Sequence, residues 1–173
     1  MKKASPILSA VTCLACAVLL AAPASAVDVV GSADTDDFGL GLSAGEPARI
    51  TSKIWFDEVH ALDIALGFGY YPYSGPALYV DYLHHAADLA SGSAGSLLFY
   101  LGIGGKFRYW NRGLGKDDVA GPSVGARVPF GLTFLFRGAP FDLFLEVTPS
   151  VAFISPRAVW FDLDAALGGR FYF

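Results

Sequence analysis

The feature that most constrains this sequence is a two-residue alternation of apolar and polar side chains, which begins at Phe38 and continues to Phe173. A period of two is that of a pleated strand, whose successive side chains point to opposite faces of a sheet. Short runs rich in glycine, proline, serine and acidic residues separate the alternating segments and predict turns. We divide this region into eight strands, at residues 38–45, 48–56, 61–71, 77–85, 97–110, 123–136, 141–154 and 159–173.

Charged side chains fall on only one face of these segments. The face that carries the bulky apolar residues of each strand has no Asp, Glu, Lys or Arg. A slip of one residue would exchange the two faces of a strand, so this separation indicates a sheet with one face in an apolar environment. The opposite face holds six basic and six acidic residues: Arg49, Lys53, Asp63, Asp81, Lys106, Arg108, Arg127, Asp142, Glu146, Asp162, Asp164 and Arg170.

Two kinds of closed barrel fit this alternation. A water-soluble barrel hides its apolar face inside, whereas a membrane barrel turns that face to lipid and encloses a polar lumen. The charged face also carries small residues such as Gly41, Gly102 and Gly104, as a narrow lumen requires, and only 16% of the chain is charged. We therefore predict an all-β fold, an eight-stranded antiparallel up-and-down transmembrane β-barrel. A soluble periplasmic lipocalin-like ligand-binding barrel remains the alternative.

Residues 1–26 have the three parts of a secretory signal peptide. A basic start and an apolar middle precede a small-residue cleavage site at Ala24-Ser25-Ala26. Cleavage would remove both cysteines and leave an acidic leader, residues 27–37, before a barrel of residues 38–173. A lipoprotein anchored through one of the cysteines is disfavoured, because the apolar run continues well past both. We expect export to the outer membrane of a Gram-negative cell.

Aromatic residues gather near the ends of the predicted strands. If the two ends of the barrel sequence face the periplasm, these residues form the two aromatic girdles of a membrane barrel. The outer girdle is Tyr70, Tyr71, Tyr109, Trp110 and Trp160, and the inner girdle is Trp55, Phe56, Phe141, Phe171 and Phe173. Residues 111–122 form the longest outer connection and the best place for a surface ligand. Residues 86–96 are a long connection for an inner turn.

The final residues, Leu167-Gly168-Gly169-Arg170-Phe171-Tyr172-Phe173, resemble the closing strand of bacterial outer-membrane barrels, which end on Phe after alternating apolar residues. This resemblance implies that Phe173 belongs to an insertion signal read by the barrel-assembly machinery. Together with Gly39-Leu40-Gly41, Lys53-Ile54-Trp55 and Asp81-Tyr82-Leu83, it makes the chain similar to the small OmpA-like and OmpX-like eight-stranded barrels, and to a family of such barrels without assigned activity. It implies outer-membrane lipid and lipopolysaccharide as surroundings and supplies no catalytic residues.

The balanced charges of the predicted lumen indicate cross-strand ion pairs, because an unpaired charge is costly in a low-dielectric interior. We expect Asp63, Glu146, Asp162 and Asp164 to accept from Lys106, Arg108, Arg127 and Arg170. An eight-stranded barrel is just wide enough for side chains to fill, so a plugged lumen is favoured over a gated ion path.

His60, His84 and His85 are the only histidines, and no serine or acidic partner is evident for them. The adjacent His84 and His85 must point to opposite faces of a strand, which makes them a poor metal-binding pair. We therefore expect a structural or surface-interaction role without catalysis, cofactor or metal. A lipid A-modifying outer-membrane enzyme is the alternative. The formal net charge of −4 argues against a nucleic-acid partner.

Overall fold

The computed structural model describes residues 38–45, 47–69, 75–110, 120–154 and 159–173, so the predicted signal peptide and leader lie outside it. No helical span within these ranges has the length and hydropathy that a membrane crossing needs. The strands are β1 (Phe38–Gly45), β2 (Ala48–Trp55), β3 (His60–Gly69), β4 (Gly75–Ser91), β5 (Gly95–Trp110), β6 (Gly121–Arg127), β7 (Phe130–Phe136), β8 (Phe141–Ile154) and β9 (Trp160–Tyr172).

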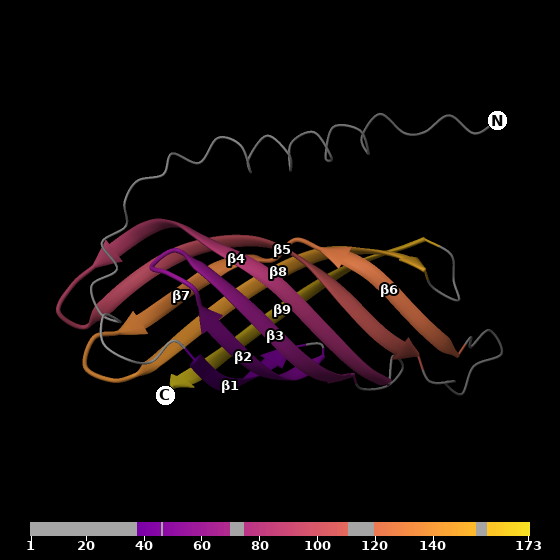
Figure 1. Ribbon diagram of the computed structural model, residues 1–173, viewed down its shortest axis with the longest axis horizontal. Coiled ribbons are helices and arrows are strands. Elements are labelled where there is room, and N and C mark those ends of the chain that lie inside the picture. The colour runs from indigo at the N-terminus through magenta and orange to yellow at the C-terminus, as the bar shows by residue number, and fades with distance from the viewer. Residues whose placement is uncertain (1–37, 46, 70–74, 111–119, 155–158) are drawn as a thin grey trace, which may run out of the picture.

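The sheet closes on itself. Every pairing is antiparallel, and the first strand, β1, pairs with both β2 and β9 (Figure 1). Both β6 and β7 pair with β5 on one side and with β8 on the other, so they share one position in the ring. The ring therefore has eight positions, and the predicted eight-stranded antiparallel barrel is confirmed.

Proline divides one predicted strand, residues 123–136, into β6 and β7. Proline has no N–H, so Pro129 cannot donate to β5, although its carbonyl accepts from Gly102 N at 2.8 Å. On the other side Val128 N donates to Pro149 O at 3.0 Å, but Pro149 cannot donate in return. The dipeptide Val128-Pro129 thus keeps its place in the ring with fewer ladder hydrogen bonds.

The prediction of a long inner connection at residues 86–96 is wrong, because β4 and β5 form a hairpin with a shorter turn. Most of that segment is strand, because β4 continues to Ser91 and β5 begins at Gly95. Two β-bulges interrupt the register of β4, between His85 and Ala87 and between Asp88 and Ala90. They occur where β4 extends past the start of β3, and bulges of this kind twist an open strand edge away from further pairing.

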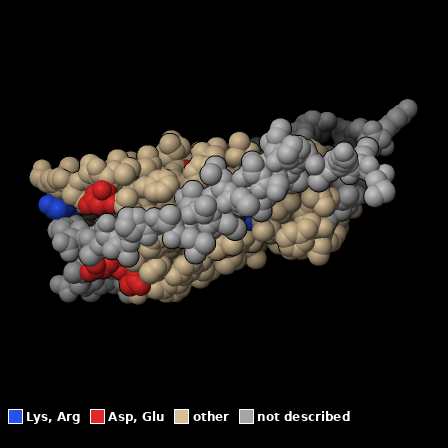
Figure 2. All heavy atoms as spheres, turned by 90° about the horizontal axis from the view of Figure 1, so that it is seen from above, with Lys and Arg blue, Asp and Glu red and all other residues tan. Residues whose placement is uncertain are grey.

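Burial alternates along each strand as a barrel with two different faces requires. On β8, for example, Leu143 and Leu145 are exposed, whereas Asp142 and Glu146 are buried inside the ring. On the side of the molecule in Figure 2, charged atoms gather mainly near one end, and uncharged residues cover most of the rest of the described wall. The exterior wall is therefore apolar and the interior polar.

Candidate functional site

The structure brings all twelve charged residues predicted for the lumen to the inside of the ring. Eleven of them are buried. The exception is Asp162, whose side chain is 27% exposed. Because a buried charge must be paired or hydrogen-bonded to be tolerated, the contacts among these residues decide what the lumen can do.

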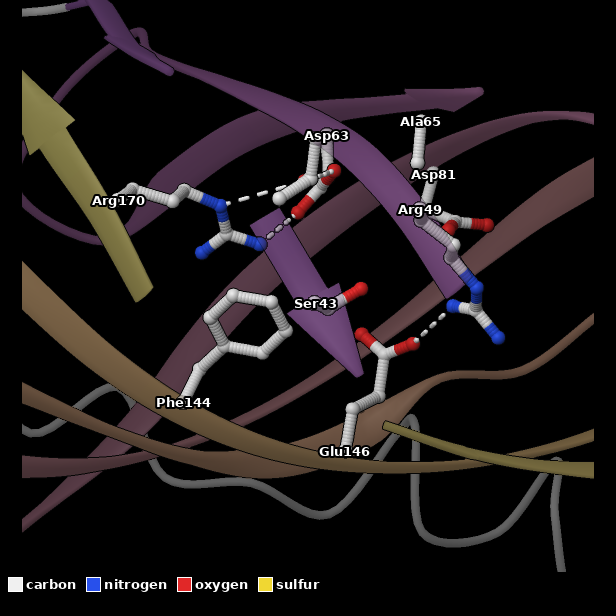
Figure 3. Close-up of a pocket in the computed structure, with 9 residues that line it drawn as sticks. Ser43, Arg49, Asp63, Ala65, Asp81, Phe144, Glu146 and Arg170 are labelled. Carbon is white, nitrogen blue, oxygen red and sulfur yellow. Dashed lines mark hydrogen bonds and ion pairs between the residues drawn. The ribbon is translucent and has the colours of Figure 1, made fainter. Parts of the chain in front are cut away.

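Arg170 of β9 is the centre of the first group of contacts (Figure 3). Its guanidinium forms ion pairs with Asp63 of β3 and with Asp142 of β8, the latter at 3.2 Å from Nη1 to Oδ2. Its Nε donates to Thr51 Oγ1 at 3.3 Å, and its Cζ lies 3.9 Å from the centroid of the Phe144 ring. One side chain thus joins four strands across the interior.

Glu146 of β8 is the centre of the second group. Its Oε1 accepts from Arg127 Nη2 at 2.9 Å and from Arg49 Nη1 at 3.4 Å, and its Oε2 accepts from Tyr100 OH at 3.1 Å. Arg127 also extends toward Asp81, with 3.3 Å between Nε and Oδ1. The guanidiniums of β2 and β6 are therefore held by carboxylates of β8 and β4.

A third group lies nearer the other end of β9. Lys106 Nζ is 2.9 Å from Asp162 Oδ2 and donates to Ser150 Oγ at 2.6 Å. Arg108 Nη2 donates to Tyr79 OH at 3.0 Å, and its Nη1 is 3.9 Å from Asp162. Because Asp162 is partly exposed, this group forms the solvated margin of the network.

Lys53 is the one predicted lumen cation that has no carboxylate partner within the described parts of the chain. Its Nζ lies 2.9 Å from His85 Nε2 and 4.0 Å from the centroid of the Trp55 ring. The prediction of Trp55 in the inner aromatic girdle is wrong, because this ring packs in the lumen against His85, with 4.2 Å between centroids. The sequence indicated this position, because Trp55 follows Lys53 by two residues and therefore lies on the same face of the strand.

Among solved structures, the N-terminal β-barrel domain of Pseudomonas aeruginosa OprF is similar to this chain, with a TM-score of 0.59 and 13% identity over 79% of this chain and 95% of that one. The chain has the fold of the small outer-membrane β-barrels. The resemblance inferred from the sequence is thereby confirmed at the level of the fold. Neisserial surface protein A (NspA) also matches, with a TM-score of 0.49 and 14% identity over 79% and 93% of the two chains. No family model and no curated protein matches the sequence.

A small cavity lies among the charged groups that the structure describes inside the ring. A cavity with a volume of about 10 Å³ lies between the first two groups, which is room for about one water molecule (Figure 3). Its lining residues are Ser43, Arg49, Thr51, Asp63, Ala65, Asp81, Phe144, Glu146 and Arg170.

Aromatic residues are present at both rims, although the structure describes only part of the predicted girdles. Tyr109 and Trp160 are exposed at one rim. Trp160 lies on the same face of β9 as the lumen residues. Phe171 and Phe173 are exposed at the opposite rim, and Phe141 is half-buried there. The remaining predicted positions, Tyr70, Tyr71, the side chain of Trp110 and residues 111–119 of the predicted surface loop, lie outside the described residues.

The histidines separate onto the two faces. His85 is buried in the lumen, whereas His60 and His84 lie on the exterior wall and are half-buried. The expectation that they lack an acidic partner is wrong for His60, whose Nδ1 is 2.8 Å from Asp57 Oδ2. This partner precedes His60 by three residues in the turn between β2 and β3, so a local turn contact could have been anticipated.

Proposed function

We propose that this protein is a small outer-membrane barrel with a closed, charged lumen, and that its role is structural or surface-interacting rather than catalytic. The observation that carries this proposal is the set of ion pairs that cross the interior around a cavity of only about 10 Å³. A path for ions would need a continuous column of water, which the ion pairs described between the strands would interrupt. The known width of eight-stranded barrels supports the same reading.

The location in the outer membrane is part of this proposal. It is supported by the barrel fold, by the apolar exterior wall and by the signal-peptide pattern of residues 1–26. Lipid and lipopolysaccharide would then surround the wall, and residues 111–122 would be the segment most open to a surface ligand. Recovery of the exported protein with the inner membrane or the periplasm on fractionation would contradict this location.

Recognition by the barrel-assembly machinery belongs to the same proposal. Phe173 is 63% exposed, while its backbone N donates to Phe38 O at 3.0 Å. The terminal aromatic ring is thus accessible at the seam between β1 and β9. We expect the variant Phe173→Ala to reach the outer membrane in smaller amounts than wild type, and equal amounts would remove this part of the proposal.

Planar-bilayer recording tests whether the lumen is closed. We expect no steady conductance from the wild-type protein, because ion pairs and packed side chains occupy the lumen. The double variant Arg49→Ala/Glu146→Ala removes one cation and one anion that touch each other at 3.4 Å, and so keeps the charge balance while emptying space. We expect this variant to conduct ions. Steady wild-type conductance would show that the lumen is open.

A further inference from the structure

The exterior wall carries a pair of histidines that are far apart in the sequence and adjacent in the sheet. His60 of β3 and His84 of β4 are direct cross-strand partners. Their neighbours Val59 and His85 share a hydrogen bond, from His85 N to Val59 O at 2.7 Å, so His60 and His84 occupy a non-hydrogen-bonded position. Partners at such positions have Cα atoms only about 4.5 Å apart, and their side chains are close. The two imidazole centroids lie 4.9 Å apart.

The turn before β3 orients the first of these rings. Asp57 accepts hydrogen bonds from Val59 N at 2.9 Å and from His60 N at 2.7 Å, so its carboxylate is fixed in the turn. It also lies 2.8 Å from His60 Nδ1. An ionised carboxylate at Nδ1 selects the tautomer with the proton on that nitrogen and leaves the lone pair of Nε2 free to bind a metal.

The second ring also has a nitrogen that makes no hydrogen bond within the described residues. His84 Nδ1 is buried and has no hydrogen-bond partner in the described parts of the chain. The Tyr82 ring stacks on His60, with 5.8 Å between centroids, and Phe56 stacks on Tyr82 at 6.4 Å. The pair therefore lies against aromatic rings, beside an exposed turn that carries the acidic residues Asp57 and Glu58.

We propose that His60 and His84 form a binding site for a borderline divalent cation such as Zn²⁺, with Asp57 as the carboxylate that orients His60. Imidazole nitrogen suits zinc, copper and nickel, and zinc takes four ligands. Within the described residues no group of three or more His, Cys, Asp and Glu side chains could hold a metal. Water would therefore fill the remaining positions, as in an exchangeable site. The inference concerns the exterior wall and does not depend on a closed lumen.

Zinc titration of the purified full chain by isothermal titration calorimetry tests this site. The protein should carry Cys13→Ser and Cys16→Ser and no affinity tag, so that no thiolate or added histidine competes. We expect one zinc ion per chain near pH 7.5, and loss of saturable binding in His60→Gln and in His84→Gln. Binding should also weaken as the pH falls, because a protonated imidazole cannot bind a metal.

Matched variants separate this site from nonspecific binding. Asp57→Asn should weaken zinc binding by about 10–100-fold, the usual cost of losing an outer-sphere partner. Glu58→Gln removes a neighbouring negative charge outside the proposed site, and His85→Gln changes the lumen histidine. Both variants should bind zinc with an affinity within a few-fold of wild type. The shift in gel mobility on boiling verifies that each variant is folded. The proposal would be overturned if the wild-type protein showed no saturable zinc binding. It would also be overturned if binding persisted in both His60→Gln and His84→Gln.

Discussion

Replacing Gly104 by valine is expected to prevent the barrel from folding, whereas the same replacement at the adjacent Gly105 is expected to be tolerated. A Cβ atom on Gly104 would lie 2.0 Å from Asp81 Oδ1 and 2.3 Å from the backbone oxygen of Val80. The backbone of β4 would have to move, so the effect should exceed the 1–3 kcal/mol that is typical of overpacking. A Cβ atom on Gly105 meets only Gly125 O, at 3.7 Å.

Refolding from urea into detergent, followed by gel electrophoresis without boiling, measures this difference. We expect the folded fraction of Gly104→Val to fall at least tenfold, while Gly105→Val refolds like wild type because its side chain points away from the barrel. The two variants add the same atoms at neighbouring positions, so strand propensity and hydrophobicity are matched. Equal refolding of both would mean that the two faces of β5 are assigned incorrectly.

Replacing Arg170 by methionine is expected to lower the free energy of unfolding by about 3–5 kcal/mol, the usual cost of removing one partner from a buried ion pair. Methionine retains much of the side-chain volume, but it leaves the carboxylates of Asp63 and Asp142 buried without their shared cation. Asp142 would keep the hydrogen bonds from Tyr172 OH, at 2.6 Å, and from the backbone N of residue 170, at 3.2 Å, but neither donor carries a positive charge. Urea unfolding in lipid vesicles provides the measurement.

Two further variants make this measurement specific. Arg137→Met removes a cation from an exposed turn and should change the free energy of unfolding by less than about 0.5 kcal/mol. The triple variant Arg170→Met/Asp63→Asn/Asp142→Asn removes the uncompensated charges as well, and should recover part of the stability that Arg170→Met loses. A loss for Arg170→Met no larger than that for Arg137→Met would contradict a stabilising network.

The positions of the strands could be predicted from the sequence because period-two alternation and turn residues are local signals. The prediction was wrong where another local effect disturbed that period. The missing N–H of Pro129 divides one strand, and the bulges near Ala87 and Ala90 hide the end of β4. The face that each charged residue occupies could also be predicted, because successive residues of a strand point to alternate faces.

The contacts between those residues depend on ring closure and register, which are not local. Asp63 and Arg170 meet although 107 positions separate them, because closure of the ring brings the two strands within reach across the interior. The partnership of His60 with His84 was missed for the same reason. Sequence reasoning compared neighbours along the chain, His84 and His85, whereas the antiparallel register sets His60 opposite His84.

A nitroxide scan along β8 tests the orientation of the wall most directly. Single cysteines placed in turn at residues 141–154, in a chain without Cys13 and Cys16, would carry the label in lipid vesicles, and electron paramagnetic resonance would report collisions with dissolved oxygen. We predict a two-residue period, with high oxygen accessibility at Leu143, Leu145 and Phe153 and low accessibility at Asp142, Phe144 and Glu146. The opposite phase, or no periodicity, would contradict a barrel with its apolar wall in lipid.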